Sequence, residues 1–154
     1  MSNTFTQLYV QIIFAVMHKN ALIDQLWEER LYRYITGIIQ NKGNKMIAIN
    51  GMPNHIHLFI GMIPDISMSD LVREVKKSST NFINGERLSS NKFQWQPGYG
   101  AFSFGRSDID PIAKHIMNQK EYHKSNTFKE EYLGLLKTFG IDYNENYLFD
   151  WMED

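Results

Sequence analysis

The chain of 154 residues contains no cysteine, which excludes disulfides and thiolate metal sites. It also lacks any hydrophobic run that approaches the length of a membrane-spanning helix. Its N-terminal segment has no basic stretch of the kind that opens a secretory signal peptide. We therefore expect a cytoplasmic protein with no membrane partner.

The sequence has no marked excess of charge of either sign, because its formal net charge is −1. This balance hides an asymmetry, since residues 142–154 contain five acidic side chains and no basic one. The other residues carry a formal charge of +4, and part of that excess gathers at Arg73, Lys76 and Lys77. A basic patch can bind DNA phosphates whatever the total charge, although a solvated helix face gives the same pattern.

What the sequence does contain is enough apolar material for a core, since 43% of its residues are hydrophobic and 14% are aromatic. We predict one domain over residues 1–154 that ends in an acidic tail at residues 142–154. Large apolar side chains interrupt this tail: Tyr143, Tyr147, Leu148, Phe149 and Trp151. They argue against disorder and predict that the tail docks on the body or on a partner subunit.

Hydrophobic periodicity and turn residues predict an alternating order of strands and helices. The expected strands cover residues 8–16, 46–50, 54–58 and part of 93–105, and the expected helices cover residues 23–42, 68–83, 108–124 and 127–139. The resulting order, β-α-β-β-α-β followed by two helices, is that of an α+β ferredoxin-like fold with a split β-α-β arrangement. Such a fold has an antiparallel sheet with helices on one face, so we expect the other face to be open.

Two histidines lie close together in the strand predicted at Asn54-His55-Ile56-His57-Leu58. Side chains two residues apart in a strand point to the same face, with Cα atoms about 6.6–7 Å apart. His55 and His57 can therefore hold one divalent cation between them. A half-buried pair without metal produces the same motif, so the motif alone does not decide.

The helix predicted over residues 108–124 carries a polar stripe. His115, Gln119 and Tyr122 follow one another at i, i+4 and i+7, which places them on one side of a helix. A partly solvated helix border would give the same stripe without any chemistry. Its neighbour His123 fits a solvated helix end or a phosphate contact.

Four segments of the chain, residues 52–58, 96–103, 118–121 and 127–132, resemble the IS200/IS605 family of single-strand DNA transposases. This is the single-tyrosine group of HUH endonucleases, named for histidine, hydrophobe, histidine, and it includes transposases associated with REP sequences. The segments occur in the order of the family and extend over most of the chain.

The resemblance implies a ferredoxin-like fold, a homodimer, and DNA transposition by cutting and rejoining single-stranded DNA near hairpins. It implies that His55, His57 and Gln119 bind Mg²⁺ or Mn²⁺. In this family the cation polarises the scissile phosphate, and a tyrosine attacks it to form a 5′-phosphotyrosine link. Covalent catalysis of this kind needs no external energy.

One departure from the family concerns this tyrosine, which lies four residues before the glutamine. In this chain that position is His115, and Tyr122 stands where the family commonly has a histidine. Three interpretations follow. In the first, the protein has lost nicking activity and kept metal and DNA binding. In the second, Tyr122 has become the nucleophile, although it lies about 10 Å further along a helix. In the third, His115 itself attacks phosphorus or binds the metal.

Two further functions remain open. The first is a non-catalytic module for single-stranded nucleic acid, in which the basic helix follows the backbone and aromatic side chains stack on bases. The candidates for stacking are Tyr9, Phe14, Phe59 and Trp95, although core packing is the alternative for each and is the expectation for Phe14 and Phe59. The second is a metal hydrolase unrelated to DNA that uses the two histidines as ligands. For this hydrolase the sequence offers no clear third carboxylate.

Overall fold

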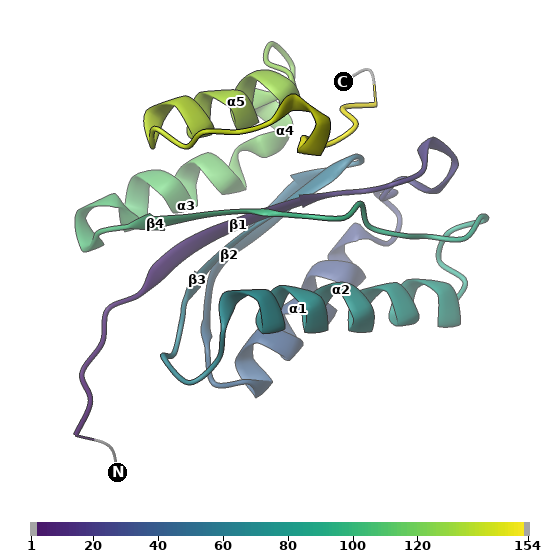
Figure 1. The fold of residues 1–154 in the computed structure, drawn as a ribbon. Coiled ribbons are helices and arrows are strands. Elements are labelled where there is room, and N and C mark those ends of the chain that lie inside the picture. Colours follow the sequence, from purple (N-terminus) through teal and green to yellow (C-terminus); the bar gives the residue numbers. More distant parts are fainter. Residues whose placement is uncertain (1–2, 153–154) are drawn as a thin grey trace.

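The computed structural model describes residues 3–152, and its centre is a four-stranded antiparallel sheet. The strands run in the order β2-β3-β1-β4 (Figure 1). Their bounds are Tyr9–Ala15 for β1, Lys45–Met52 for β2, His55–Gly61 for β3 and Gly100–Phe104 for β4. The predicted α+β fold with a split β-α-β arrangement is confirmed.

Five α-helices and three short 3-10 helices accompany the sheet within residues 3–152. The α-helices are α1 (Glu28–Asn41), α2 (Met68–Gly85), α3 (Ile109–Met117), α4 (Gln119–Tyr122) and α5 (Phe128–Thr138). The 3-10 helices are η1 (Lys19–Ala21), η2 (Arg106–Asp108) and η3 (Glu145–Tyr147).

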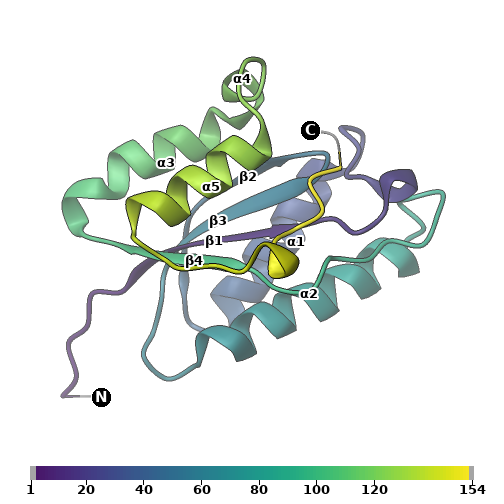
Figure 2. The same cartoon turned by 45° about the horizontal axis from the view of Figure 1, so that its top comes forward.

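The helices cover both faces of the sheet, which corrects the expectation of an open face. α1 and α2 lie on one face, and α3, α4 and α5 lie on the other (Figures 1 and 2). The physical reason lies in the second face itself, where Ala48 and Phe59 need cover and Ile116 of α3 buries them. We call these the α1–α2 face and the α4–α5 face.

Alternation along β3 sorts its side chains between the two faces. Ile56, Leu58 and Ile60 belong to the large core cluster, whereas Phe59 belongs to the small cluster under α3. His55 and His57 share the direction of Phe59, because successive residues of a strand point to opposite sides. The two histidines therefore face the C-terminal helices.

Two helices begin at residues whose side chains cap them. Ser67 Oγ accepts a hydrogen bond from the Asp70 N–H at the start of α2. At the start of α5, Thr127 and Glu130 form a reciprocal capping box. These contacts fix where each helix begins, and the cap of α5 will matter for the site.

The helix predicted over residues 108–124 is broken. α3 ends at Met117, Asn118 has φ −96° and ψ 16°, and α4 then begins at Gln119. The N–H groups of Glu121 and Tyr122 both donate to the Asn118 carbonyl, so a new short helix starts there. The break redirects the residues that follow it toward the sheet.

The acidic tail docks on the body, as predicted. The ring centroids of Phe149 and Tyr132 lie 5.0 Å apart, and those of Trp151 and Phe128 lie 5.3 Å apart. The Asp150 N–H donates to Gln96 Oε1, and Gln96 Nε2 donates to the Asp150 carbonyl. No helix within residues 3–152 combines the length and the apolar character needed to cross a membrane.

Candidate metal centre

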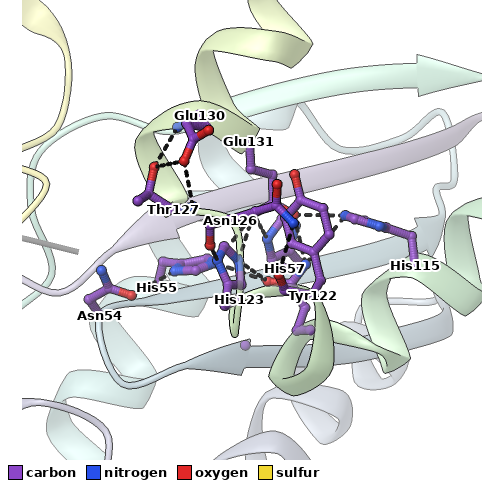
Figure 3. A network of polar contacts seen from close by, with 12 residues as sticks. Asn54, His55, His57, His115, Tyr122, His123, Asn126, Thr127, Glu130 and Glu131 are labelled. Atoms are coloured by element: carbon purple, nitrogen blue, oxygen red, sulfur yellow. Dashed lines mark hydrogen bonds and ion pairs between the residues drawn. The ribbon is translucent and has the colours of Figure 1, made fainter.

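The two histidines of β3 lie side by side beneath α4 and α5. Their ring centroids are 5.0 Å apart, and both side chains are 0% exposed. The prediction that His55 and His57 point to the same face is confirmed. Figure 3 shows both rings within a network of polar side chains.

His55 is held by its neighbour in sequence. Its Nδ1 lies 2.7 Å from Asn54 Oδ1, and this contact assigns the ring hydrogen to Nδ1. Burial lowers the pKa of His55 to about 4, although Glu131 opposes that shift. The ring is therefore neutral at pH 7, and its Nε2 presents a lone pair to the inside of the cluster.

Gln119 joins the histidines from the first residue of α4. Its side chain is 0% exposed, and its Oε1 lies 3.0 Å from His55 Nε2. The three predicted metal ligands, His55, His57 and Gln119, are thus brought to one place. The break at Asn118 makes this possible, because it turns Gln119 toward the sheet.

Glu131 of α5 is a member of the site that the sequence reasoning missed. Its Oε1 lies 3.1 Å from His57 Nε2, and its Oε2 lies 2.7 Å from His115 Nε2. Burial raises the pKa of Glu131, but its interactions with His115, His123, His55 and His57 outweigh burial and hold the pKa well below its usual range. The buried side chain is therefore a carboxylate.

The sequence does contain a signal for Glu131. It follows Phe128 by three residues and precedes Leu135 by four, so it shares their side of α5. A carboxylate on the apolar side of a helix requires a buried partner.

His123 was also misjudged, since neither a solvated helix end nor a phosphate contact fits its burial. Its side chain is 1% exposed, and its Nε2 lies 3.0 Å from Gln119 Oε1 and 3.1 Å from Glu131 Oε1. Its Nδ1 faces the Asn126 carbonyl at 2.7 Å. The turn after α4 brings the ring under α5, where water does not reach it.

The residues present fit a divalent cation. Among the described residues, the ligand atoms of His55, His57 and Glu131 all lie within 4.8 Å of one another. The bare Nε2 of neutral His55 faces the carbonyl-type oxygen of Gln119, although both atoms are acceptors. A cation between such atoms turns their repulsion into coordination.

His115 and Tyr122 lie beside this cluster. Their ring centroids are 4.7 Å apart, so the axial offset expected for a continuous helix does not separate the two side chains. Both line a pocket of about 240 Å³ together with Glu131 and Gln11. Burial, with help from Glu131 and Glu130, raises the pKa of Tyr122, so its phenol is protonated at pH 7.

An aromatic wall closes the other side of the cluster. The His55 ring stacks on Phe128 with centroids 3.8 Å apart and planes only 2° from parallel. Phe128 in turn contacts Phe149 and Trp151 of the docked tail. The tail therefore supports a candidate metal ligand through one intervening ring.

The predicted DNA-binding residues of α2 lie on the other face of the sheet (Figure 1). Arg73 is exposed and pairs with Asp70, while Lys77 is exposed. Lys76 donates to the carbonyls of Gln96 and Gly98, and burial lowers its pKa to about 8. All three basic residues line an open groove of about 370 Å³, apart from the metal centre.

The aromatic residues named as candidates for base stacking are mostly unavailable. Phe14 and Phe59 are fully buried, and Trp95 donates its ring N–H to Ser79 within the core. Core packing is therefore confirmed for Phe14 and Phe59, and base stacking by Trp95 is wrong, whereas Tyr9 is partly exposed.

Comparisons with known proteins give concordant results. Residues 4–119 match the family model described as "Transposase IS200 like". The ISDra2 transposase TnpA of Deinococcus radiodurans is 22% identical over 120 residues, which cover 75% of this chain and 86% of that protein.

Solved structures share the fold. A candidate transposase from Deinococcus radiodurans superposes with a TM-score of 0.62 and 19% identity, covering 77% of this chain and 95% of that one. A REP-associated tyrosine transposase bound to a REP hairpin superposes with a TM-score of 0.60 and 15% identity, covering 80% and 73% respectively.

Proposed function

We propose, from the premise that this chain belongs to the family of IS200-like transposases, that it cuts and rejoins single-stranded DNA in a metal-dependent reaction. The observation that carries this proposal is the convergence of His55, His57 and Gln119. His55 Nε2 and Gln119 Oε1, which come from elements 64 residues apart, lie 3.0 Å from each other. Two imidazoles and one amide oxygen form a donor set suited to a divalent cation.

The metal ligands in this proposal are His55 and His57 of β3 and Gln119 of α4. Bound Mg²⁺ or Mn²⁺ would withdraw electron density from a phosphate oxygen. The protein's own contribution is to hold the ligands in place, and Asn54 does so for His55. The pocket of about 240 Å³ beside Glu131 offers space for a phosphate group.

We assign the nucleophile to Tyr122. Its ring contacts His115, which occupies the tyrosine position of the family, and both side chains line the same pocket. Tyr122 Oη would bond to phosphorus while the bond from phosphorus to the 3′ oxygen breaks. The phenol proton passes to that oxygen, leaving a 5′-phosphotyrosine link and a free 3′-hydroxyl; attack by another 3′-hydroxyl reverses the step and rejoins the DNA.

The substrate in this proposal is DNA with a hairpin next to the cleavage site, and the protein acts as a homodimer. The relative bound to a REP hairpin supports a hairpin partner. The exposed side chains of Arg73 and Lys77, with Lys76 between them, supply positive charge for its backbone.

A second candidate is a binding module without nicking activity. The observation that favours it is the replacement of the family's tyrosine by His115. Such a module would bind hairpin DNA through the same fold and would form no covalent link.

One assay separates these functions. A hairpin oligonucleotide labelled at its 3′ end is incubated with the protein and Mn²⁺, and adducts that survive denaturation are separated by electrophoresis. We expect an adduct that Tyr122→Phe abolishes and His115→Ala only reduces. An acid-labile adduct in Tyr122→Phe would assign attack to His115 instead, and hairpin binding without any adduct would establish the binding module.

A further inference from the structure

We infer that His123 and Glu131 complete the metal centre. The site then offers three imidazoles, one carboxylate and the Gln119 amide oxygen, and it binds a transition-metal ion such as Zn²⁺ in preference to Mg²⁺. This inference deepens the proposed function, on whose metal requirement it rests. It adds two ligands to the set and restricts the class of cation.

The spacing of the donor atoms is the first argument. Glu131 Oε1 lies 3.1 Å from the Nε2 atoms of His57 and His123 and 3.6 Å from that of His55. Gln119 Oε1 lies 3.0 Å from the Nε2 atoms of His55 and His123. Ligands about 2.0–2.2 Å from one ion are about 2.8–3.6 Å from their neighbours in octahedral or tetrahedral geometry. The distances from Glu131 Oε1 and from Gln119 Oε1 to these ring nitrogens have this spacing.

The orientation of the rings is the second argument. Each of the three imidazoles is held through Nδ1 and turns Nε2 inward. The Nδ1 partners are Asn54 Oδ1 for His55, the Asn126 carbonyl for His123 and Gln11 Nε2 for His57, at 2.7, 2.7 and 2.9 Å. The Asn126 carbonyl accepts only, so Nδ1 of His123 carries a hydrogen, whereas the Gln11 amide N–H donates and Nδ1 of His57 accepts. Outer partners of this kind orient ring nitrogens toward a metal.

The orientation of the Glu131 carboxylate is also fixed by hydrogen bonds. Its Oε2 accepts from Gln119 Nε2 and from His115 Nε2, both at 2.7 Å. These two bonds leave Oε1 directed at the three inward nitrogens. His115 therefore acts as a positioning residue for a ligand, whatever its relation to DNA.

The kind of donor decides the class of cation. Mg²⁺ prefers oxygen ligands and usually keeps several waters, whereas imidazole nitrogen suits Zn²⁺, Fe²⁺, Ni²⁺ and Cu²⁺. Three nitrogens surround this centre, and their rings are almost completely shielded from water. A hydrated Mg²⁺ ion finds neither its preferred ligands nor room for its waters among them.

The test measures metal binding by the full-length chain without DNA. Protein freed of metal with a chelator is titrated with Zn²⁺, Mn²⁺ and Mg²⁺ by calorimetry, and with Co²⁺ by visible absorption, which reports nitrogen and oxygen ligation directly. We expect Zn²⁺ to bind at least 100-fold more tightly than Mg²⁺. Equal affinities for the two ions would overturn the inference.

Two variants test the added ligands. We expect His123→Ala and Glu131→Gln each to weaken Zn²⁺ binding by about 10–100-fold and to change the Co²⁺ spectrum. The matched controls are His18→Ala, which lies in the segment between β1 and η1, and Glu121→Gln, which is exposed. Wild-type affinity and spectra in both ligand variants would refute their roles.

Folding and function are kept apart by two further measurements. Circular dichroism of each metal-free variant shows whether it is folded. If His123→Ala is unfolded, His123→Gln, which keeps more of the side-chain volume, replaces it. The comparison of Zn²⁺ with Mg²⁺ on the wild type needs no variant. Tight Zn²⁺ binding without a DNA adduct would sink only the nicking proposal, whereas an adduct with weak Zn²⁺ binding would sink only this inference.

Discussion

The two faces of the sheet are both buried, but only one of them also encloses a cluster of polar side chains. Toward α1 and α2 the interior is filled by rings and aliphatic chains, as where Phe14 meets Trp95 edge to face at 4.7 Å. Toward α4 and α5 it holds imidazoles, an amide and the Glu131 carboxylate. Apolar packing stabilises the first face by itself, whereas the second collects acceptors that favour a cation.

Stability and chemistry are therefore divided between the two faces. Burial of apolar surface is non-directional and tolerates small shifts, while a cluster of acceptors depends on the place of each atom. The α1–α2 face can therefore hold the sheet rigid while the α4–α5 face is shaped for binding. The predictions below alter one face at a time.

The largest effect is expected on the apolar face. Phe14→Ala removes a fully buried ring and should lower the free energy of unfolding by about 3–5 kcal/mol. Urea denaturation of metal-free protein measures this loss, and Phe5→Ala, which alters a 95% exposed ring, is the control. A loss below about 1 kcal/mol would show that this face does not hold the fold together.

Metal removal should act on the α4–α5 face. At a free Zn²⁺ concentration 100 times the dissociation constant, binding adds about 2.7 kcal/mol to stability. We expect the urea midpoint to fall by the corresponding amount after chelation, and His57→Ala to abolish the difference between the two conditions. A His57→Ala protein that still gains stability from Zn²⁺ would contradict the site.

A smaller effect is expected where α5 begins. Thr127→Ala removes the side chain that caps the Glu130 N–H and should cost about 1 kcal/mol. Because Glu131 lies in this first turn, we also expect weaker Zn²⁺ binding, measured by calorimetry. Thr127→Ser keeps the capping oxygen and should behave like the wild type. Loss of stability with unchanged Zn²⁺ affinity would uncouple the cap from the centre.

The smallest effect concerns a charge on the apolar face. Burial lowers the pKa of Lys76 to about 8 from an unfolded value of 10.5, so its charged form is disfavoured in the folded state. This penalty is complete below pH 8 and fades as the pH rises toward 10.5. Stability of the wild type relative to Lys76→Met should therefore increase between pH 8 and 9.5 in urea denaturation. A flat difference would place Lys76 in water.

Much of the fold follows from local sequence. The β-branched and aromatic run of β1, the caps at Ser67 and Thr127, and the turn before His55 each depend on neighbours in the chain. The shared direction of His55 and His57 follows from strand geometry alone. These features were predictable because short-range chemistry determines them.

The rest of the centre was not predictable in this way. The break at Asn118 goes against the helical periodicity of residues 108–124, and it is stable because it buries Gln119 and His123 against the sheet. Glu131 reaches His57 across 74 residues of sequence. No local pattern reports such a meeting, although a carboxylate on the apolar side of α5 gave a hint.

The stack of His55 on Phe128 links the far end of the polypeptide to a histidine at the heart of the molecule. Phe149 and Trp151 press on Phe128 from outside, so a protease cut or an early stop codon before them would remove its backing. We expect the shortened chain to keep its sheet but to bind the proposed cation more weakly. Truncation at the carboxy terminus is thus expected to loosen the proposed metal centre without unfolding the domain.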